Sequence, residues 1–242
     1  MGNEGDLPRP TRLGEVLWLE PYPDALLEYA VGSDPGPEAH YEAREAISLA
    51  FITALQLLPP RQRAAQILRE VLGFRASEVA EILGSTEDSV TSALKRARAT
   101  LQVKVRPISD HEPPPPPRSP TERAVVERFT RAFQADDIED LIALLTEQVW
   151  INMPPLPFEW QGHSAAREVL RIVLAPGRHL VPTWANGQPA FGLYLPMPTT
   201  AQLHSVGMLV LTLAGDRVSA ITRFDTGVLS SFNLPAALTL PL

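Results

Sequence analysis

The chain has 242 residues, of which 45% are apolar and 20% are charged, a composition typical of a folded protein with room for two domains. It contains no cysteine, which excludes disulfides and thiolate metal sites, and its net charge of −7 argues against a protein that binds polyanions over its whole surface. No signal peptide opens the sequence and no apolar run approaches the roughly 20 residues that span a bilayer, so we expect a cytoplasmic protein.

The first 40 residues are rich in glycine, proline and charge, and we expect them to form a loose lead-in and a strap. Within them, the segment from Trp18 to Asp24 is aromatic and stiffened by proline. Such a segment is suited either to anchor on a neighbouring domain or to cover the first helices. The sequence leaves both interpretations open.

Residues 41–104 have the pattern of a small all-α domain. Apolar residues recur at three- and four-residue spacing from Tyr41 to Leu57, which predicts an amphipathic helix that ends at the two prolines that follow Leu58. Three more helices are expected, over residues 61–72, 76–83 and 86–104, and a glycine suited to end a helix precedes each of the last two. Two short helices joined by a tight turn predict a helix-turn-helix.

The last of these helices has the chemistry of a DNA-recognition helix. Its first half carries short polar side chains that suit base edges or phosphates in a major groove, and its second half is basic. The residues expected to contact DNA are Arg75, Thr86, Ser89, Thr91, Ser92, Lys95, Arg96 and Arg98. Residues 61–104 carry eight basic and five acidic side chains, so the local basic excess is small. Glu87 and Asp88 at the helix start oppose phosphate binding.

Three blocks of this domain resemble region four of extracytoplasmic-function sigma factors: Leu57 to Arg63, Gly73 to Leu83, and Val90 to Leu101. The resemblance implies a module that docks on RNA polymerase and reads the −35 promoter element through its last helix. Sigma factors of this kind also carry a region two, which melts the −10 element. Only about 40 residues precede the first clear helix here, so we expect region two to be lacking.

A second domain is expected over residues 121–242, after a linker over residues 105–120. The linker contains five consecutive prolines, which favour an extended, semi-rigid spacer. Helices are expected from Thr121 to Phe133, over 136–145 and over 163–173, a turn after 159–162, and strands over 149–153, 180–185, 189–195, 202–213 and 217–224. Helices followed by long strands predict an α+β cone, in which helices close a curved, mostly antiparallel sheet around a cavity.

This second domain resembles the SnoaL-like domains in its order of elements and in the phrases Phe133 to Asp137, Met153 to Pro157 and Gly162-His163. The group includes polyketide cyclases, relatives of ketosteroid isomerase and limonene epoxide hydrolases. Such a domain is also fused to the C-terminus of one group of extracytoplasmic-function sigma factors. The resemblance implies a cavity for a hydrophobic or polyketide-like small molecule, with no cofactor. The isolated histidines form no metal-ligand set, so no metal is expected.

We expect the cavity to have apolar walls with a few convergent polar groups. The ligand-binding candidates are Trp150, Asn152, Trp160, His163 and Trp184. The catalytic candidates are Asp225 or His204 as general acid or base, and Tyr194 or Arg223 as the group that stabilises an oxyanion. Two plainer interpretations stand beside these: Arg223 and Asp225 suit a simple ion pair, and His163 suits a helix start.

Two hypotheses of function follow. The first is a sigma-factor-like transcription regulator that binds promoter DNA and RNA polymerase through its helix-turn-helix and is controlled by the SnoaL-like domain, either through a ligand or through docking. The second is a cofactor-independent enzyme of natural-product biosynthesis, a cyclase, isomerase or ring-opening hydrolase, in which the sigma-like helices are only scaffold.

Overall fold

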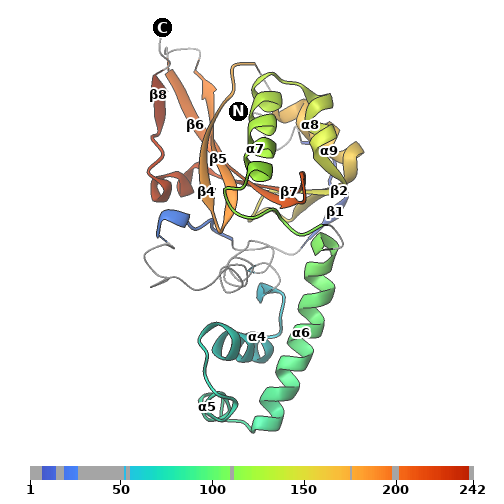
Figure 1. The fold of residues 1–242 in the computed structure, drawn as a ribbon, viewed down its shortest axis with the longest axis vertical. Helices are drawn as coiled ribbons and strands as arrows, with labels where there is room; N and C mark the ends of the chain where they lie inside the picture. The colour runs from blue at the N-terminus through green and yellow to red at the C-terminus, as the bar shows by residue number, and fades with distance from the viewer. Residues whose placement is uncertain are drawn as a thin grey trace. The chain divides into compact units, whose positions relative to one another are not determined.

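The protein is organised as two compact units (Figure 1). A computed structural model describes residues 7–14, 19–26, 52, 55–109, 112–174, 176–197 and 202–239. One unit, the helical unit, is Pro35–Asp110, and the other, the cone unit, joins Met1–Asp34 to His111–Leu242. In the part of the chain that the structure describes, no helix is long and apolar enough to cross a membrane.

The helical unit contains the helices expected from the sequence between residues 60 and 109. Its elements are α4 (Pro60–Gln66), the π-helical η2 (Ile67–Val71), α5 (Ala76–Ile82) and α6 (Glu87–Ser109). The helix expected over 61–72 is thus present, but its second half is wound as a π-helix. Helix α6 continues past its expected end into the expected linker. Most of the helix expected from Tyr41 to Leu57 lies outside the described residues.

Two apolar clusters hold the helical unit together and fix which side of α6 is buried. The first joins Ala65 of α4 to Val79 and Ala80 of α5 and to the first turns of α6. The second joins Leu55 and Leu58 to the later turns of α6. The buried residues of α6 are Val90, Ala93, Leu94, Ala97 and Leu101, the three- and four-residue spacing of one helix face. The opposite face of α6 is therefore left to solvent.

The cone unit is an eight-stranded sheet with helices packed on it. Its helices are α7 (Pro120–Gln134), α8 (Ile138–Leu144), α9 (Gly162–Val173) and the 3-10 helix η3 (Thr226–Phe232). Its strands are β1 (Arg12–Leu13), β2 (Leu145–Asn152), β3 (Phe158–Gln161), β4 (His179–Ala185), β5 (Gln188–Pro196), β6 (Gln202–Ala214), β7 (Arg217–Phe224) and β8 (Ala237–Thr239). The fold class expected from the sequence, an all-α domain followed by an α+β cone, is confirmed.

The sheet runs in the order β1-β3-β2-β7-β6-β5-β4, with β8 added beside β6. All strand pairs are antiparallel except β2 with β7. The three strands β1, β3 and β8 were not expected, because each is short; the residues of β3 had been assigned to the approach to a turn. Helices α7, α8 and α9 lie together over one side of the sheet (Figure 1).

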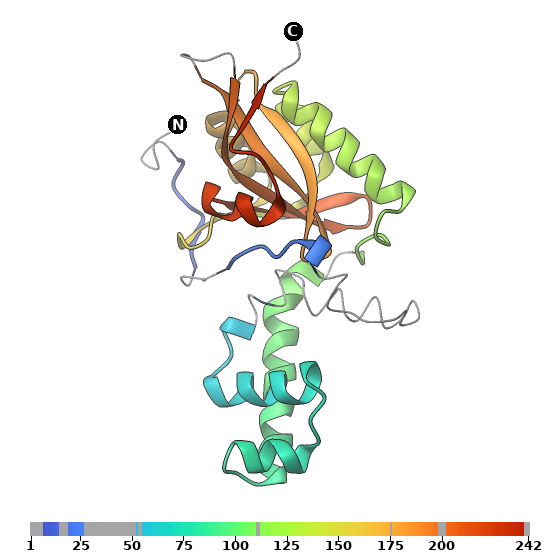
Figure 2. The same cartoon turned by 90° about the vertical axis from the view of Figure 1, so that its left-hand side faces the viewer.

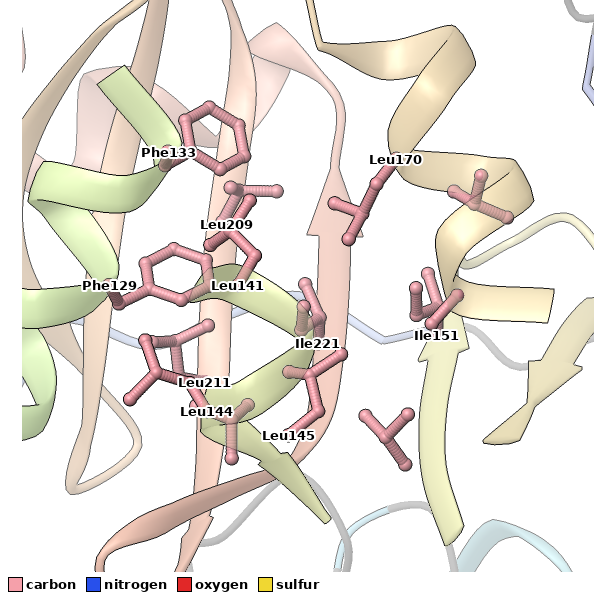
Figure 3. Packing of buried hydrophobic residues seen from close by; sticks show 14 of the residues in the cluster. Phe129, Phe133, Leu141, Leu144, Leu145, Ile151, Leu170, Leu209, Leu211 and Ile221 are labelled. Carbon is pink, nitrogen blue, oxygen red and sulfur yellow. The ribbon is translucent and has the colours of Figure 1, made fainter. Parts of the chain in front are cut away.

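The main core of the cone unit lies between these helices and the sheet. Phe129 stacks on Phe133 of the same helix and on Phe191 of β5, each pair with ring centroids 5.7 Å apart. Leu170 projects from α9 toward the same space, opposite the two phenylalanines of α7 (Figure 3). Burying such side chains stabilises the fold by about 1.5–3 kcal/mol each. The core therefore joins both α7 and α9 to the strands of the sheet.

A β-bulge on β6 bends the centre of the sheet. Leu193 of β5 pairs with Gly207 and Tyr194 pairs with Ser205, so Val206 is the extra residue of the bulge. Gly207 has a φ of +144°, and a Cβ there would lie 2.4 Å from the carbonyl oxygen of Phe224. Only glycine fits this position without a shift of the backbone.

The segment after β7 packs on the face of β5 opposite the helices. The hydroxyl of Tyr194 donates a hydrogen bond to the carbonyl oxygen of Pro235 at 2.8 Å, and Gly192 faces Leu234. Burial raises the pKa of the Tyr194 phenol. The tyrosine therefore stays neutral and serves as the anchor of the C-terminal segment.

The N-terminal segment is anchored on the cone unit, which decides between the two interpretations of its aromatic stretch (Figure 2). Strand β1 pairs with β3, and the indole nitrogen of Trp160 donates to the carbonyl oxygen of Pro8 at 3.0 Å. Further along, the amide of Tyr22 donates to Asn186 Oδ1 at 2.8 Å and the amide of Asn186 donates back to the carbonyl of Tyr22 at 2.9 Å. Trp18 itself lies outside the described residues.

The bulge yields a first prediction. Replacing Gly207 with alanine forces a side chain into a left-handed conformation and against Phe224, so we expect a loss of about 3 kcal/mol of stability. Urea unfolding followed by tryptophan fluorescence measures it for the cone unit alone, because all four tryptophans belong to that unit. Gly227→Ala is the matched control, since nothing lies within 4 Å of a Cβ there. Equal stability of the two variants would contradict the bulge as described.

The C-terminal anchor yields a second prediction. Tyr194→Phe removes one hydrogen bond and leaves the ring in place, so it is expected to lower the stability of the cone unit by about 1 kcal/mol. The same urea titration measures the change. Hydrogen exchange at the amides of η3 and β8 should rise in this variant, and unchanged exchange there would refute the anchoring role.

Candidate functional site

A cavity of about 320 Å³ lies inside the cone unit. Its walls come from the N-terminal segment, α7, the residues from β2 to the loop after it, α9, and strands β5, β6 and β7. The lining residues are Leu7, Phe129, Phe133, Ile151, Met153, Pro154, Pro155, Leu156, Val169, Leu170, Ile172, Val173, Arg178, Leu193, Leu195, Val206, Leu209, Ile221, Arg223 and Asp225. The walls are therefore apolar apart from two arginines and one aspartate.

The bulge on β6 explains how the cavity wall is assembled. Val206 and Leu209 both line the cavity, although residues three apart on a regular strand point to opposite faces. The extra residue at the bulge moves the strand by one position, so both side chains reach the same face. Figure 3 shows Leu209 and Ile221 on neighbouring strands, facing the helical layer.

Three charged residues, Arg178, Arg223 and Asp225, line the cavity. Arg223 donates from Nη2 to the carbonyl oxygen of Val206 at 3.0 Å, so the bulge also holds this arginine. Its Nη1 lies 3.6 Å from Asp225 Oδ1, a long ion pair, and the Asp225 side chain is 80% exposed. The plainer interpretation, an ion pair between Arg223 and Asp225, matches this geometry.

Arg178 is the other cationic group of the cavity, and it precedes β4. Its Nε is buried and has no hydrogen-bond partner among the described residues. Burial is the main cause that lowers the pKa of Arg178; nearby Asp136 opposes this shift and Arg223 adds to it. The guanidinium nevertheless stays charged at neutral pH, because the ordinary pKa of arginine lies far above neutral.

The structure corrects the expected lining of the cavity by one residue along β2. Trp150 and Asn152 do share a face, but Ile151 and Met153 line the cavity and the other two residues do not. The Trp150 ring instead lies 5.0 Å from the guanidinium carbon of Arg12 in β1. In this part of β2 the buried residues Val149 and Ile151 alternate with the half-buried Trp150 and Asn152, so the buried face is the one that carries the cavity lining.

The other three ligand-binding candidates also lie outside the cavity lining. Trp160 is buried in the core and is held by the hydrogen bond to Pro8. His163 stands in the first turn of α9, with Nε2 3.3 Å from the carbonyl oxygen of Leu145, which fits its interpretation as a helix-start residue. Trp184 borders a separate hollow of about 190 Å³, together with Arg118 and Asn233.

The four catalytic candidates are not brought together. Arg223 and Asp225 line the cavity, whereas Tyr194 faces the opposite side of β5 and His204 is absent from the lining. His204 pairs with Leu195 and with Ala237 of β8, and its Nε2 is buried without a hydrogen-bond partner among the described residues. An acid–base pair of the kind expected for the enzyme hypothesis is therefore not assembled in this cavity.

The second candidate surface is the solvent face of α6. All the expected DNA contacts are exposed, and the seven beyond Arg75 lie in or next to the first three turns of that helix: Thr86, Ser89, Thr91, Ser92, Lys95, Arg96 and Arg98. Thr86 also caps the helix, since its hydroxyl accepts a hydrogen bond from the amide of Ser89 at 3.2 Å. Glu87 and Asp88 are exposed in the first turn of the helix, as expected.

The basic residues of this surface differ in their surroundings. Arg98 forms an ion pair with Glu70, with Nη2 2.7 Å from Oε1. Among the described residues, Lys95 and Arg96 make no ion pair and are exposed. Arg75 begins α5, where its amide donates to Glu78 Oε2 at 2.6 Å, so its backbone is occupied and its side chain is exposed. Lys95 and Arg96 are thus the cations most available to phosphates.

Four exposed apolar residues of the same unit, named here the exposed apolar cluster, were not predicted by sequence reasoning. The solvent-exposed fractions are 55% for Val71, 58% for Leu72, 38% for Phe74 and 53% for Ile82. These residues come from the end of η2, the turn after it and the end of α5. Leu72 continues the apolar spacing of the helix expected over residues 61–72, a spacing that predicts a buried side chain. The π-helical turn breaks that spacing.

Comparison with known proteins agrees with the two-part architecture. Residues 48–101 match the family described as Sigma-70, region 4. The chain is 39% identical over 233 residues to the ECF RNA polymerase sigma factor SigG of Mycobacterium tuberculosis, which is 93% of this chain and 60% of that relative. It is 31% identical over 137 residues to SigJ of the same organism, 57% of this chain and 40% of that protein.

The crystal structure of Mycobacterium tuberculosis SigJ has the same fold, with a TM-score of 0.60 at 22% identity, over 92% of this chain and 77% of that one. The chain spans about 60% of the length of the SigG relative. The expected lack of a region two therefore stays a prediction. Residues 48–101 thus match the sigma-70 region 4 family, and the chain resembles extracytoplasmic-function sigma factors along nearly all of its length.

Proposed function

We propose that this protein is a sigma-factor-like transcription regulator that binds promoter DNA and RNA polymerase through its helical unit. The observation that carries the proposal is the division of α6 into two faces. Its apolar residues are buried and its short polar and basic residues are exposed, within the segment that matches region 4. An exposed helix face of this composition is suited to a major groove. The names of the relatives, RNA polymerase sigma factors, support the same function.

The exposed apolar cluster supports a protein partner for the same unit. Four large apolar side chains on one small unit are more than scattered exposure explains, and such clusters mark protein interaction sites. We assign this cluster, Val71, Leu72, Phe74 and Ile82, to RNA polymerase. DNA and polymerase would then contact different elements of the helical unit.

We assign the regulator function to residues 41–104, with residues 105–120 as the connector and residues 121–242 as the cone domain that controls it. The N-terminal segment from Leu7 to Leu26 contacts the cone and works with it. A cavity without an assembled acid–base pair suits a ligand-binding or docking role better than a catalytic one.

The DNA surface yields a third prediction. The double variant Lys95→Ala with Arg96→Ala removes two cations, so affinity for duplexes selected on the protein from a randomised pool should fall about tenfold or more. The slope of log affinity against log salt should also fall by about 2. Fluorescence anisotropy measures both quantities. Arg171→Ala, an exposed arginine of the cone unit, is the control and should change neither. Failure to select any preferred sequence, with unchanged affinity in the double variant, would overturn DNA binding.

The apolar cluster yields a fourth prediction. Leu72→Ser with Ile82→Ser should weaken binding to RNA polymerase core at least tenfold, because both side chains are more than half exposed and are available to a partner. Surface plasmon resonance with immobilised core enzyme measures the change. Leu13→Ser, a 68% exposed leucine of the cone unit, is the matched control. Affinity for DNA should stay within twofold, and equal loss in the control would refute the assignment.

A further inference from the structure

The cavity of the cone unit combines apolar walls with two half-buried cations. Fifteen or more of its lining residues are aliphatic, aromatic or proline side chains, and the charged ones are Arg178, Arg223 and Asp225. At about 30 Å³ per non-hydrogen atom, the volume of one water molecule in the liquid, a cavity of about 320 Å³ holds about ten such atoms. The space therefore fits a small organic molecule.

The Nε of Arg178 has no hydrogen-bond acceptor among the described residues. A buried guanidinium nitrogen without a hydrogen-bond partner costs free energy, and native structures rarely leave one. Its Nε is in this state among the described residues, although the residue lines the cavity. Asp136 is an opposite charge that acts on Arg178 and raises its pKa, but no ion pair joins the two in the described part of the chain. The missing acceptor points to a ligand that supplies one.

Arg223 is held so that part of its guanidinium remains available. The bulge carbonyl of Val206 takes one Nη2 hydrogen bond, which fixes the side chain against the sheet. Asp225 lies 3.6 Å from Nη1, outside ordinary hydrogen-bond distance, and its carboxylate is 80% exposed to solvent. Water therefore competes for Asp225, and an anion in the cavity would meet two guanidinium groups and one screened carboxylate.

We propose that the cavity binds an apolar organic anion, a carboxylate with a hydrocarbon tail, whose charged group is held by Arg178 and Arg223. The tail lies against the apolar walls between Phe133, Leu170 and Leu209. Planar guanidinium groups bind carboxylates through two parallel hydrogen bonds, which selects this head group over a neutral one. The role of this ligand as the regulatory input of the cone rests on the proposed function. The binding of the ligand to the cavity needs neither DNA nor polymerase.

The experiment uses octanoate, 1-octanol and octylammonium as probes on the full chain. All three probes contain eight carbons and have about the size that the cavity admits; they differ in the charge of the head group, and the tail of octanoate is one carbon shorter than the other two, which works against the expected preference for octanoate. Isothermal titration calorimetry should show octanoate binding at least tenfold tighter than octanol, with no binding of octylammonium. Octanol that binds as tightly as octanoate, or no binding of octanoate at all, would overturn the proposal. This comparison needs no substitution, so it stands even if a variant fails to fold.

The two arginines are then tested separately. Arg178→Met and Arg223→Met should each weaken octanoate at least tenfold and leave octanol within twofold, since methionine keeps the apolar stem and removes the charge. Arg178→Lys and Arg223→Lys should recover part of the loss. Arg217→Met, an exposed arginine that begins β7, is the matched control and should change nothing. Unchanged octanoate affinity in both methionine variants would place the ligand elsewhere and refute the assignment.

The outcomes separate this inference from the proposed function. Octanoate selectivity that depends on the arginines, with no effect of the Lys95 and Arg96 substitutions on DNA, supports the ligand site and overturns the DNA-binding role. The reverse pattern overturns the ligand site and leaves the regulator proposal intact.

Discussion

The close approach of Gly207 to the carbonyl of Phe224 is the constraint on which the cone unit depends. This contact leaves no room for a Cβ, so only glycine fits beside the bulge, and the extra residue of the bulge brings Val206 and Leu209 to the same face, where a regular strand would place them on opposite faces. The same bulge frees the carbonyl of Val206, which positions Arg223. One backbone irregularity therefore shapes both the apolar wall of the cavity and the position of Arg223.

The helical unit differs from the cone unit, because one face of its helix α6 stays exposed to solvent. Its core consists of alanine, leucine and valine side chains, which join α4, α5 and α6 through narrow stripes. A narrow buried stripe leaves most of the circumference of α6 to solvent. The sequence places serine, threonine and basic residues on that remainder, and it places an ion pair between Arg98 and Glu70 where α6 lies close to η2.

Much of this fold could be predicted from the sequence, and the successes and failures have distinct physical causes. Helices and long strands followed from apolar spacing and from glycine and proline, as for α5, β6 and β7. The cavity did not follow, because Ile151 and Trp150 are both apolar and nothing local shows which one faces inward. Arg178 could not be found either, since it lies outside every periodic element and matters only through what the fold brings near it. The exposed cluster around Leu72 was missed because a π-helical turn interrupts the helix period.

The surface of α6 was easier to predict than the cavity, and the reason is general. A helix face is set by neighbours three and four residues away in the sequence, so its exposed residues can be read from one segment. A cavity wall gathers residues from seven or more elements, and an error of one position in any strand reverses the face of every side chain in it.

The pairing of the N-terminal segment with the cone makes the helical unit an insertion between two parts of one folded body. The helical unit, Pro35–Asp110, is preceded and followed in the chain by parts of the cone unit, so both of its ends continue into the same domain. The helical unit is therefore a loop of chain between two parts of the cone unit, and closing a loop costs conformational entropy. The contacts of β1, Tyr22 and Asn186 offset this loss. Leu7, in the same segment, lines the cavity. A molecule in the cavity would thus touch the chain segment whose attachment keeps the loop closed.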